Sequence, residues 1–231
     1  MSRRNKLQKF SELHTSPNVY ENLDATNPGL TGENNAPVDL KGKWCEGHFK
    51  NPNPLTLELA CGKGDYTIGL AQLYPDRNFI GVDIKGARIW RGAKTAMEAN
   101  VQNAAFLRTR IEQIELFFDE KEVDEIWITF PDPFLRGSKL NRRLTSPMFL
   151  DRYKKILQPG GIVHLKTDEI QLYDFTLETL SAQQDYQLLY HDADIYGKPL
   201  HLPELEIKTF YERQHLANGK TIKYVKFRLG F

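Results

Sequence analysis

The fold is decided by residues 55–65, which read LTLELACGKGD and lead into a helical stretch that ends near residue 73. The apolar-rich residues 55–59 predict a strand, and Gly62 and Gly64 predict a tight turn before the helix. Glycine lets the backbone pass close beneath a ligand, and open α/β sheets bind ligands at the carboxyl edge of their strands. This segment therefore predicts the first strand, loop and helix of a ligand-binding α/β domain.

The rest of the chain repeats this pattern of short apolar runs and amphipathic stretches. We predict further strands at residues 78–82, 105–107, 125–130 and 162–165, a helix that starts at Ser146-Pro147 and is stopped at 159–161, and an antiparallel strand at 221–229. This order favours a Rossmann-like, doubly wound, mostly parallel α/β sheet with a C-terminal antiparallel strand. We expect this domain to cover residues 41–231, after an irregular N-terminal arm over residues 1–40.

Composition narrows the classes of function. The chain has 231 residues, 40% of them hydrophobic and 26% charged, which is the ordinary globular range. Lys and Arg total 31 against 30 Asp and Glu, so any contact with a nucleic acid must come from local clusters of charge. Cys45 and Cys61 lack the spacing of a metal or disulfide framework. No apolar run is long enough for a membrane span or a secretory signal, so we expect a cytoplasmic protein. The spacing of the cysteines leads us to expect no bound metal.

An acidic residue after the second predicted strand indicates the kind of cofactor. Asp83 lies 83 − 64 = 19 positions beyond Gly64, close to the spacing of a carboxylate that binds ribose hydroxyls. A dinucleotide would need a third small residue where this chain has Thr67. Glu58 and Asp65 would repel a pyrophosphate but attract the two positive groups of S-adenosylmethionine. The charges therefore favour S-adenosylmethionine, whereas the alternative is a plain strand-to-helix turn.

A second candidate segment follows the strand predicted at 125–130. Pro131 and Pro133 restrict the backbone on both sides of Asp132, so that this carboxylate is held in a fixed place. The residues that follow include four cations within eight positions, namely Arg136, Lys139, Arg142 and Arg143. We interpret them as a phosphate-binding loop, although a merely solvated loop is the alternative.

These motifs together resemble one known family. ELACGKG, GVDIK, FPDP with a basic loop that ends in NRRL, GGIVHLKTD and TFYER occur in the order found in the bacterial tRNA (guanine-N7-)-methyltransferase family, over about residues 55–229. The resemblance implies the class I methyltransferase fold, with S-adenosylmethionine as the cofactor and tRNA as the substrate. It also implies that the methyl group goes to N7 of a guanine, by analogy in the variable loop.

The resemblance also implies roles for particular residues. Asp132 is the expected catalytic residue and touches the methyl-donor site. The other expected cofactor-binding residues are Glu58, Gly62, Gly64, Asp83 and Arg110. Arg136 stands where the family usually has a lysine that meets the tRNA. The guanosine is expected to bind Asp168, Thr209, Phe210, Tyr211 and Glu212.

Two positions depart from the family pattern. Arg110 replaces an Asp that helps to seat the adenine, and a guanidinium cannot accept a hydrogen bond from the adenine amino group. Phe134 replaces a Trp and keeps the ring but loses the indole donor.

Two other functions stay open on sequence alone. One is a methyltransferase that acts on a small molecule or a protein, and the other is a non-catalytic RNA-binding module. The pattern does not decide between a monomer and a homodimer.

Overall fold

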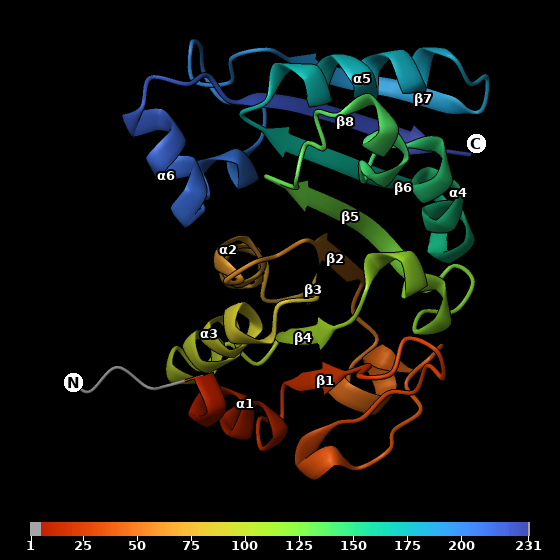
Figure 1. The fold of residues 1–231 in the computed structure, drawn as a ribbon, viewed down its shortest axis with the longest axis vertical. Coiled ribbons are helices and arrows are strands. Elements are labelled where there is room, and N and C mark those ends of the chain that lie inside the picture. The colour runs from red at the N-terminus through yellow and green to blue at the C-terminus, as the bar shows by residue number, and fades with distance from the viewer. Residues whose placement is uncertain (1–5, 231) are drawn as a thin grey trace. The chain divides into compact units, whose positions relative to one another are not determined.

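The computed structural model describes residues 6–230, and the chain forms two compact units, Met1–Asp119 and Glu120–Phe231. Figure 1 gives the helices and strands of each unit. Within residues 6–230, no helix combines the length and apolar character needed to span a bilayer.

The first unit is built on four parallel strands in the order β1-β4-β3-β2. The strands are β1 (Val19–Glu21), β2 (Leu55–Leu59), β3 (Asn78–Asp83) and β4 (Ala104–Arg108). The helices are α1 (Lys6–His14), α2 (Asp65–Leu73) and α3 (Gly86–Glu98), with short turns η1 (Glu33–Asn35), η2 (Cys45–Phe49) and η3 (Ile111–Leu116). Every residue of β2 and β3 is buried, as expected for strands in a parallel sheet.

The N-terminal segment differs from the irregular arm predicted over residues 1–40. From Lys6 onward it contains α1 and β1, and β1 pairs in parallel with β4 from Val19 opposite Phe106 to Glu21 opposite Arg108. Leu13 and Val19 are buried. The segment is therefore part of the first unit's sheet and core, although residues 1–5 lie outside the described residues.

The second unit contains the strand order β5-β6-β8-β7. Its strands are β5 (Val123–Thr129), β6 (Leu157–Thr167), β7 (Tyr186–Asp192) and β8 (Lys223–Leu229). Its helices are α4 (Pro147–Ile156), α5 (Ile170–Ser181) and α6 (Phe210–Ala217), with short turns η4 (Gly137–Arg142) and η5 (Pro203–Glu206). β5 and β6 are parallel, whereas β8 runs antiparallel to both β6 and β7.

The predicted C-terminal antiparallel strand is confirmed by β8, and the helix predicted from Ser146-Pro147 by α4. The helix ends earlier than expected, because residues 157–161 already belong to β6. β7 was not predicted, and it gives β8 its second antiparallel neighbour.

Candidate functional site

Glu58, near the end of β2, holds the loop that follows it. Its Oε2 atom accepts a hydrogen bond of 2.7 Å from the backbone N–H of Thr67 and a second, shorter one from the Thr67 hydroxyl. Gly81 lies opposite Glu58 on β3, and a Cβ atom there would stand only 2.7 Å from Thr67 Oγ1. Gly81 thus leaves the space in which Thr67 reaches Glu58. Sequence reasoning noted Thr67 only as a mismatch to a dinucleotide motif.

Asp83, at the end of β3, organises the same loop from the other side. Its Oδ2 accepts a hydrogen bond of 3.0 Å from Gly62 N, and its Oδ1 accepts one of 2.8 Å from Lys85 N. Gly62 and Gly64 have φ angles of 58° and 72°, which disfavour side chains. A Cβ on Gly64 would lie 2.5 Å from the Phe106 ring, whereas one on Gly62 would meet nothing nearer than 4.0 Å. The loop is therefore packed at Gly64 and open above Gly62.

The first unit thus brings together Glu58, Gly62, Gly64 and Asp83, as the sequence predicted. Burial, Glu58 and Asp83 together raise the pKa of the Cys61 thiol well above its usual range. The raised pKa keeps Cys61 a neutral, packed thiol. Arg110, also predicted to bind the cofactor, is exposed at the start of η3.

In the second unit, Asp132 is exposed in the loop after β5. Its Oδ1 accepts a hydrogen bond of 3.2 Å from Phe134 N. Phe130 and Phe134, on either side of the Pro-Asp-Pro segment, have positive φ angles of 49° and 42°. Non-glycine residues adopt this conformation only where surrounding structure enforces it, and such strain often marks functional loops.

The predicted basic loop divides into two kinds of residue. Arg136 and Arg142 are exposed and Lys139 is half-buried, so all three are accessible. Arg143 is only 4% exposed, and it donates hydrogen bonds to Pro133 O at 2.8 Å and to Gln171 O at 3.3 Å. The interpretation of Arg143 as a phosphate ligand is therefore wrong, because its guanidinium ties the Pro-Asp-Pro loop to α5.

Asp168 follows the end of β6 and lies beside Lys220 and His215. Its Oδ2 contacts Lys220 Nζ in a short ion pair, which raises the pKa of Lys220, and it lies 3.4 Å from His215 Nδ1. The His215 ring stacks on Phe130 at 5.9 Å between centroids and 24° between planes. The end of β5, the end of β6 and α6 therefore meet at these side chains. Sequence reasoning missed His215, which carries no motif signal of its own.

Glu212 is completely buried at the start of α6. Its Oε1 accepts from Lys166 Nζ at 2.8 Å and from Tyr196 OH at 2.7 Å, and its Oε2 accepts from Thr209 N at 3.4 Å. The Thr209 hydroxyl in turn accepts from Glu212 N, which completes a capping box. Direct contact between Glu212 and a guanine would require these partners to move. In this structure, Glu212 stabilises the start of α6 through the capping box.

Lys166, the partner of Glu212, is also fully buried and was missed in the sequence. It donates to Leu205 O at 3.0 Å and Ile207 O at 2.9 Å. Burial lowers its pKa to about 8, against the opposing effect of Glu212. Beside this network, Phe210 is 39% exposed and its ring meets Tyr211 edge-on at 5.6 Å, so Phe210 is the most accessible side chain of the predicted TFYE segment.

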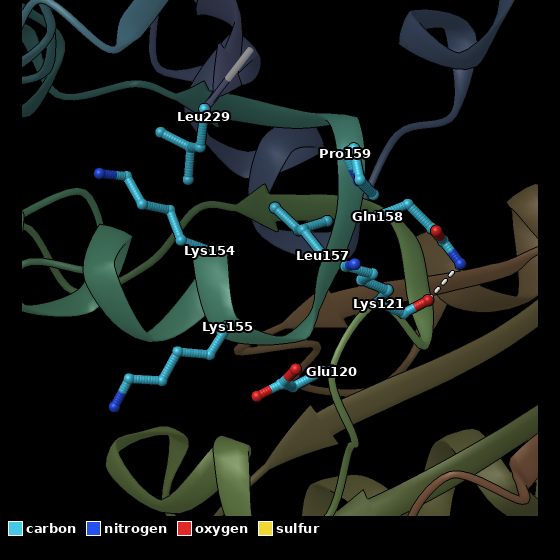
Figure 2. A pocket seen from close by; sticks show the side chains of 9 residues that line it. Glu120, Lys121, Lys154, Lys155, Leu157, Gln158, Pro159 and Leu229 are labelled. Carbon is cyan, nitrogen blue, oxygen red and sulfur yellow. Dashed lines mark hydrogen bonds between the residues drawn. The ribbon is translucent and has the colours of Figure 1, made fainter.

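A pocket of about 360 Å³ lies elsewhere in the second unit (Figure 2). It is lined by Leu157 and Gln158 at the start of β6, whereas Asp168 follows the end of that strand. The Gln158 side chain bonds to Lys121 O, and Lys154 is paired with Asp185. This pocket is therefore separate from the predicted site. Among residues 6–230, no group of three or more His, Cys, Asp or Glu side chains is arranged to hold a metal.

Comparison with known proteins first defines the class. The chain matches the family described as "Putative methyltransferase" over residues 52–225. Its structure is similar to that of the 16S rRNA methyltransferase KamB, with a TM-score of 0.62 over 84% of this chain and 95% of that one, at 14% identity. It is also similar to the antibiotic-resistance methyltransferase Kmr, with a TM-score of 0.58 over 85% and 96% and 15% identity. The predicted Rossmann-like class I methyltransferase fold is thus confirmed.

More similar relatives define the particular family. A tRNA (guanine-N(7)-)-methyltransferase of Christiangramia forsetii is 47% identical over 230 residues, which cover 99% of this chain and 100% of that one. Another, of Bacteroides thetaiotaomicron, is 46% identical over 226 residues and covers 98% and 86%. The chain belongs to the tRNA (guanine-N(7)-)-methyltransferase family, as its motifs predicted.

Proposed function

We propose that this protein transfers a methyl group from S-adenosylmethionine to N7 of a guanine in tRNA. The observation that carries this proposal is the 47% identity, over 99% of the chain, with a relative of that name. The two buried carboxylates around the open glycine loop support it, because a small-molecule cofactor site is what the reaction needs in addition to RNA contacts.

The chemistry of the glycine loop fits a cationic methyl donor. Gly62 leaves open space above the backbone, and Glu58 and Asp83 are buried beside it. After burial, which is the largest cause, Glu58 and Asp83 contribute to the raised pKa of Cys61, since both carboxylates disfavour an additional negative charge in the loop. The same carboxylates favour a sulfonium and an ammonium group. We assign Glu58, Gly62, Gly64 and Asp83 to donor binding, and Asp83 is the candidate for the ribose hydroxyls.

Guanine N7 makes simple demands on the chain, since it carries a lone pair and no proton. S-adenosylmethionine supplies an activated methyl group, whose bond to sulfur breaks, with the electron pair left on sulfur, as the bond to N7 forms. No general base is required. Positive charge develops on the purine, so a fixed carboxylate near the base stabilises the transition state more than the ground state. We assign this role to Asp132, whose loop is held by Arg143.

Recognition of the guanine is assigned to groups around Asp168 and α6. Asp168 can accept hydrogen bonds from the N1–H and N2 amino groups, a pair of donors that adenine does not present. Phe210 and Tyr211 offer ring surfaces to the base, and Thr209 and Glu212 keep the start of α6 in shape. Arg110 stays a candidate neighbour of the adenine through its backbone or its side chain.

We assign three accessible cations after the Pro-Asp-Pro segment to tRNA phosphates: Arg136, Lys139 and Arg142. In the same proposal, the modified guanine lies in the variable loop of the tRNA and the protein is cytoplasmic. The protein acts either as a monomer or as a homodimer.

The test is to map the modification on unmodified tRNA. Purified protein, the methyl donor and a tRNA transcript are incubated, and the RNA is cleaved chemically at 7-methylguanine. We expect one cleavage site, in the variable loop, and none when that guanine is changed to adenine. Label found instead in a protein or metabolite pool, with uncleaved tRNA, would favour a methyltransferase with another substrate. Absence of donor binding by calorimetry would favour a non-catalytic RNA-binding module.

A further inference from the structure

α1 and α3 lie side by side in the first unit, as Figure 1 shows in red and yellow, and they pack against each other. A hydrogen bond of 2.8 Å from Trp90 Nε1 on α3 to Glu12 Oε2 on α1 joins them. The two helices therefore present one continuous surface.

Four cations belong to this surface, and we call them the α1–α3 cationic face: Lys9 on α1, Lys85 just before α3, and Arg91 and Lys94 on α3. Lys85 and Arg91 are exposed, and Lys9 and Lys94 are half-buried. The ammonium groups of Lys9 and Lys94 lie 4.9 Å and 5.6 Å from the centre of the Trp90 ring. Such cation–π contacts hold both ammonium groups close to the Trp90 ring in the free protein.

Acidic side chains on the two helices do not balance these charges. α1 and α3 contain Glu12 and Glu98 as their only acids. Glu12 is bonded to Trp90, and Glu98 lies 3.7 Å from Lys94. The face therefore keeps a positive excess in a chain whose net charge is only +1. A local excess of this kind is the electrostatic signature of a polyanion-binding surface.

The cationic face begins at the proposed donor site. Lys85 follows Asp83 by 85 − 83 = 2 residues, and its backbone N–H donates to the Asp83 carboxylate. From Lys85 to Lys94 the helix rises about 14 Å, which matches about four phosphates of one nucleic-acid strand. Three cations of the face, Lys85, Arg91 and Lys94, lie over this length. We propose that the α1–α3 cationic face binds the phosphate backbone of the substrate tRNA, a second contact surface in addition to the basic loop. This inference rests on the proposed function.

The test uses the double variant Lys85→Gln/Arg91→Gln in the full chain. These side chains are exposed, and neither is assigned to donor binding. The matched control is Lys41→Gln/Lys121→Gln, which removes two exposed cations elsewhere. The dissociation constant for unmodified tRNA is measured across a range of salt concentrations, together with donor affinity by calorimetry and steady-state methylation.

We expect the double variant to bind tRNA at least about tenfold more weakly near 0.1 M salt, and the slope of log Kd against log salt to fall by about 0.7–0.9 for each lost contact. Donor affinity and kcat at saturating tRNA should stay at the wild-type value while KM for tRNA rises. A wild-type salt slope in the double variant would overturn the inference, and so would an equal loss in the control. Failure of the proposed function gives a different result, because the wild-type protein would then form no 7-methylguanine.

Discussion

Asp132 and Asp168 follow the ends of neighbouring parallel strands but have different surroundings. Asp168 has Lys220 and His215 beside its carboxylate, whereas Asp132 is exposed and accepts from the backbone of Phe134. A carboxylate that is already paired with a lysine is suited to accepting hydrogen bonds from the donors of a base. A carboxylate that accepts a hydrogen bond from a neutral backbone N–H responds more strongly to charge that develops on a substrate. This contrast is the physical basis for giving the two residues different roles.

Replacement of Asp132 tests this division. We expect Asp132→Asn to lower kcat by about 10²–10³, the usual loss for one stabilising group, and to leave the affinity for S-adenosylmethionine within a few-fold of wild type. Single-turnover methylation and calorimetry measure the two quantities. The exposed Asp174→Asn serves as the control. Loss of donor binding with normal single-turnover chemistry would assign Asp132 to the donor instead.

Arg142 and Arg143 are adjacent in sequence, but we expect their replacement to affect different properties, namely tRNA binding for Arg142 and stability for Arg143. Arg143→Ala removes the guanidinium donor to Pro133 O and Gln171 O and the packing against Phe175. We expect it to cost about 1–3 kcal/mol of unfolding free energy and to lower kcat. Arg142→Ala should leave stability unchanged and weaken tRNA binding. Thermal denaturation and tRNA titration compare the two, and equal stability of both variants would contradict the structural role of Arg143.

At the scale of elements, the loop between β2 and α2 must pack against Phe106 and must also leave space for a ligand. Gly64 meets the first requirement and Gly62 the second. Gly64→Ala puts a Cβ 2.5 Å from the Phe106 ring in a left-handed backbone, and we expect a loss of stability well above the strain alone. Gly62→Ala meets no such contact, so its cost should be near the left-handed strain of about 1–2 kcal/mol, while its methyl group occupies the space assigned to the donor. Urea denaturation and donor calorimetry distinguish them. Normal donor affinity in Gly62→Ala would place the donor elsewhere.

His48, in the turn η2, makes the free energy of unfolding of the first unit depend on pH in the acidic range. Burial, with a smaller effect of Lys50, lowers the pKa of His48 from 6.5 to about 4. The unfolded histidine therefore binds a proton between pH 6.5 and 4 while the folded one does not. Unfolding takes up a proton in this window, so the free energy of unfolding falls as the pH drops, by at most about 1.4 kcal/mol per pH unit. Burial lowers the pKa of His164 as well, which adds to the trend.

We expect His48→Gln to make stability less dependent on pH between 6.5 and 4, as measured by urea denaturation at several pH values. The exposed His201→Gln should leave the slope unchanged. An equally steep slope in His48→Gln would show that the histidine is protonated in the folded state.

The predictable elements are those with strong periodicity. β2 has the predicted bounds, and α4 and β8 lie where the preceding capping and turn residues predict them. β1 was missed because three residues are too short for a pattern. β7 was missed because most of its residues are exposed or half-buried, so the apolar alternation of a core strand is absent.

The site was predictable where chemistry is local in sequence, as at Gly62 and Asp83. It was not predictable where partners come from distant elements. Lys166 and Glu212 lie 46 positions apart (212 − 166), and Arg143 reads as one of four similar cations until its burial is known. A charge within an apolar strand, as at Lys166, is the one signal that could have indicated a buried pair.

At the scale of the whole molecule, a net charge of +1 limits how tRNA can be attracted. Long-range steering is weak for such a chain, so binding must depend on a few local contacts and on salt. Among the described residues, the accessible cations after the Pro-Asp-Pro segment and the α1–α3 cationic face are two surfaces that can make such contacts, one in each unit. Their separate contributions are measurable, because each has variants that leave the other intact.

The most direct test of methyl transfer to guanine N7 is to identify the labelled nucleoside. tRNA is incubated with the protein and methyl-labelled S-adenosylmethionine, digested to nucleosides and analysed by mass spectrometry, in parallel with a transcript that contains 7-deazaguanosine in place of guanosine. We predict label in 7-methylguanosine from the normal tRNA and none from the 7-deaza transcript. Label in another nucleoside, or equal labelling of the 7-deaza transcript, would contradict the assignment.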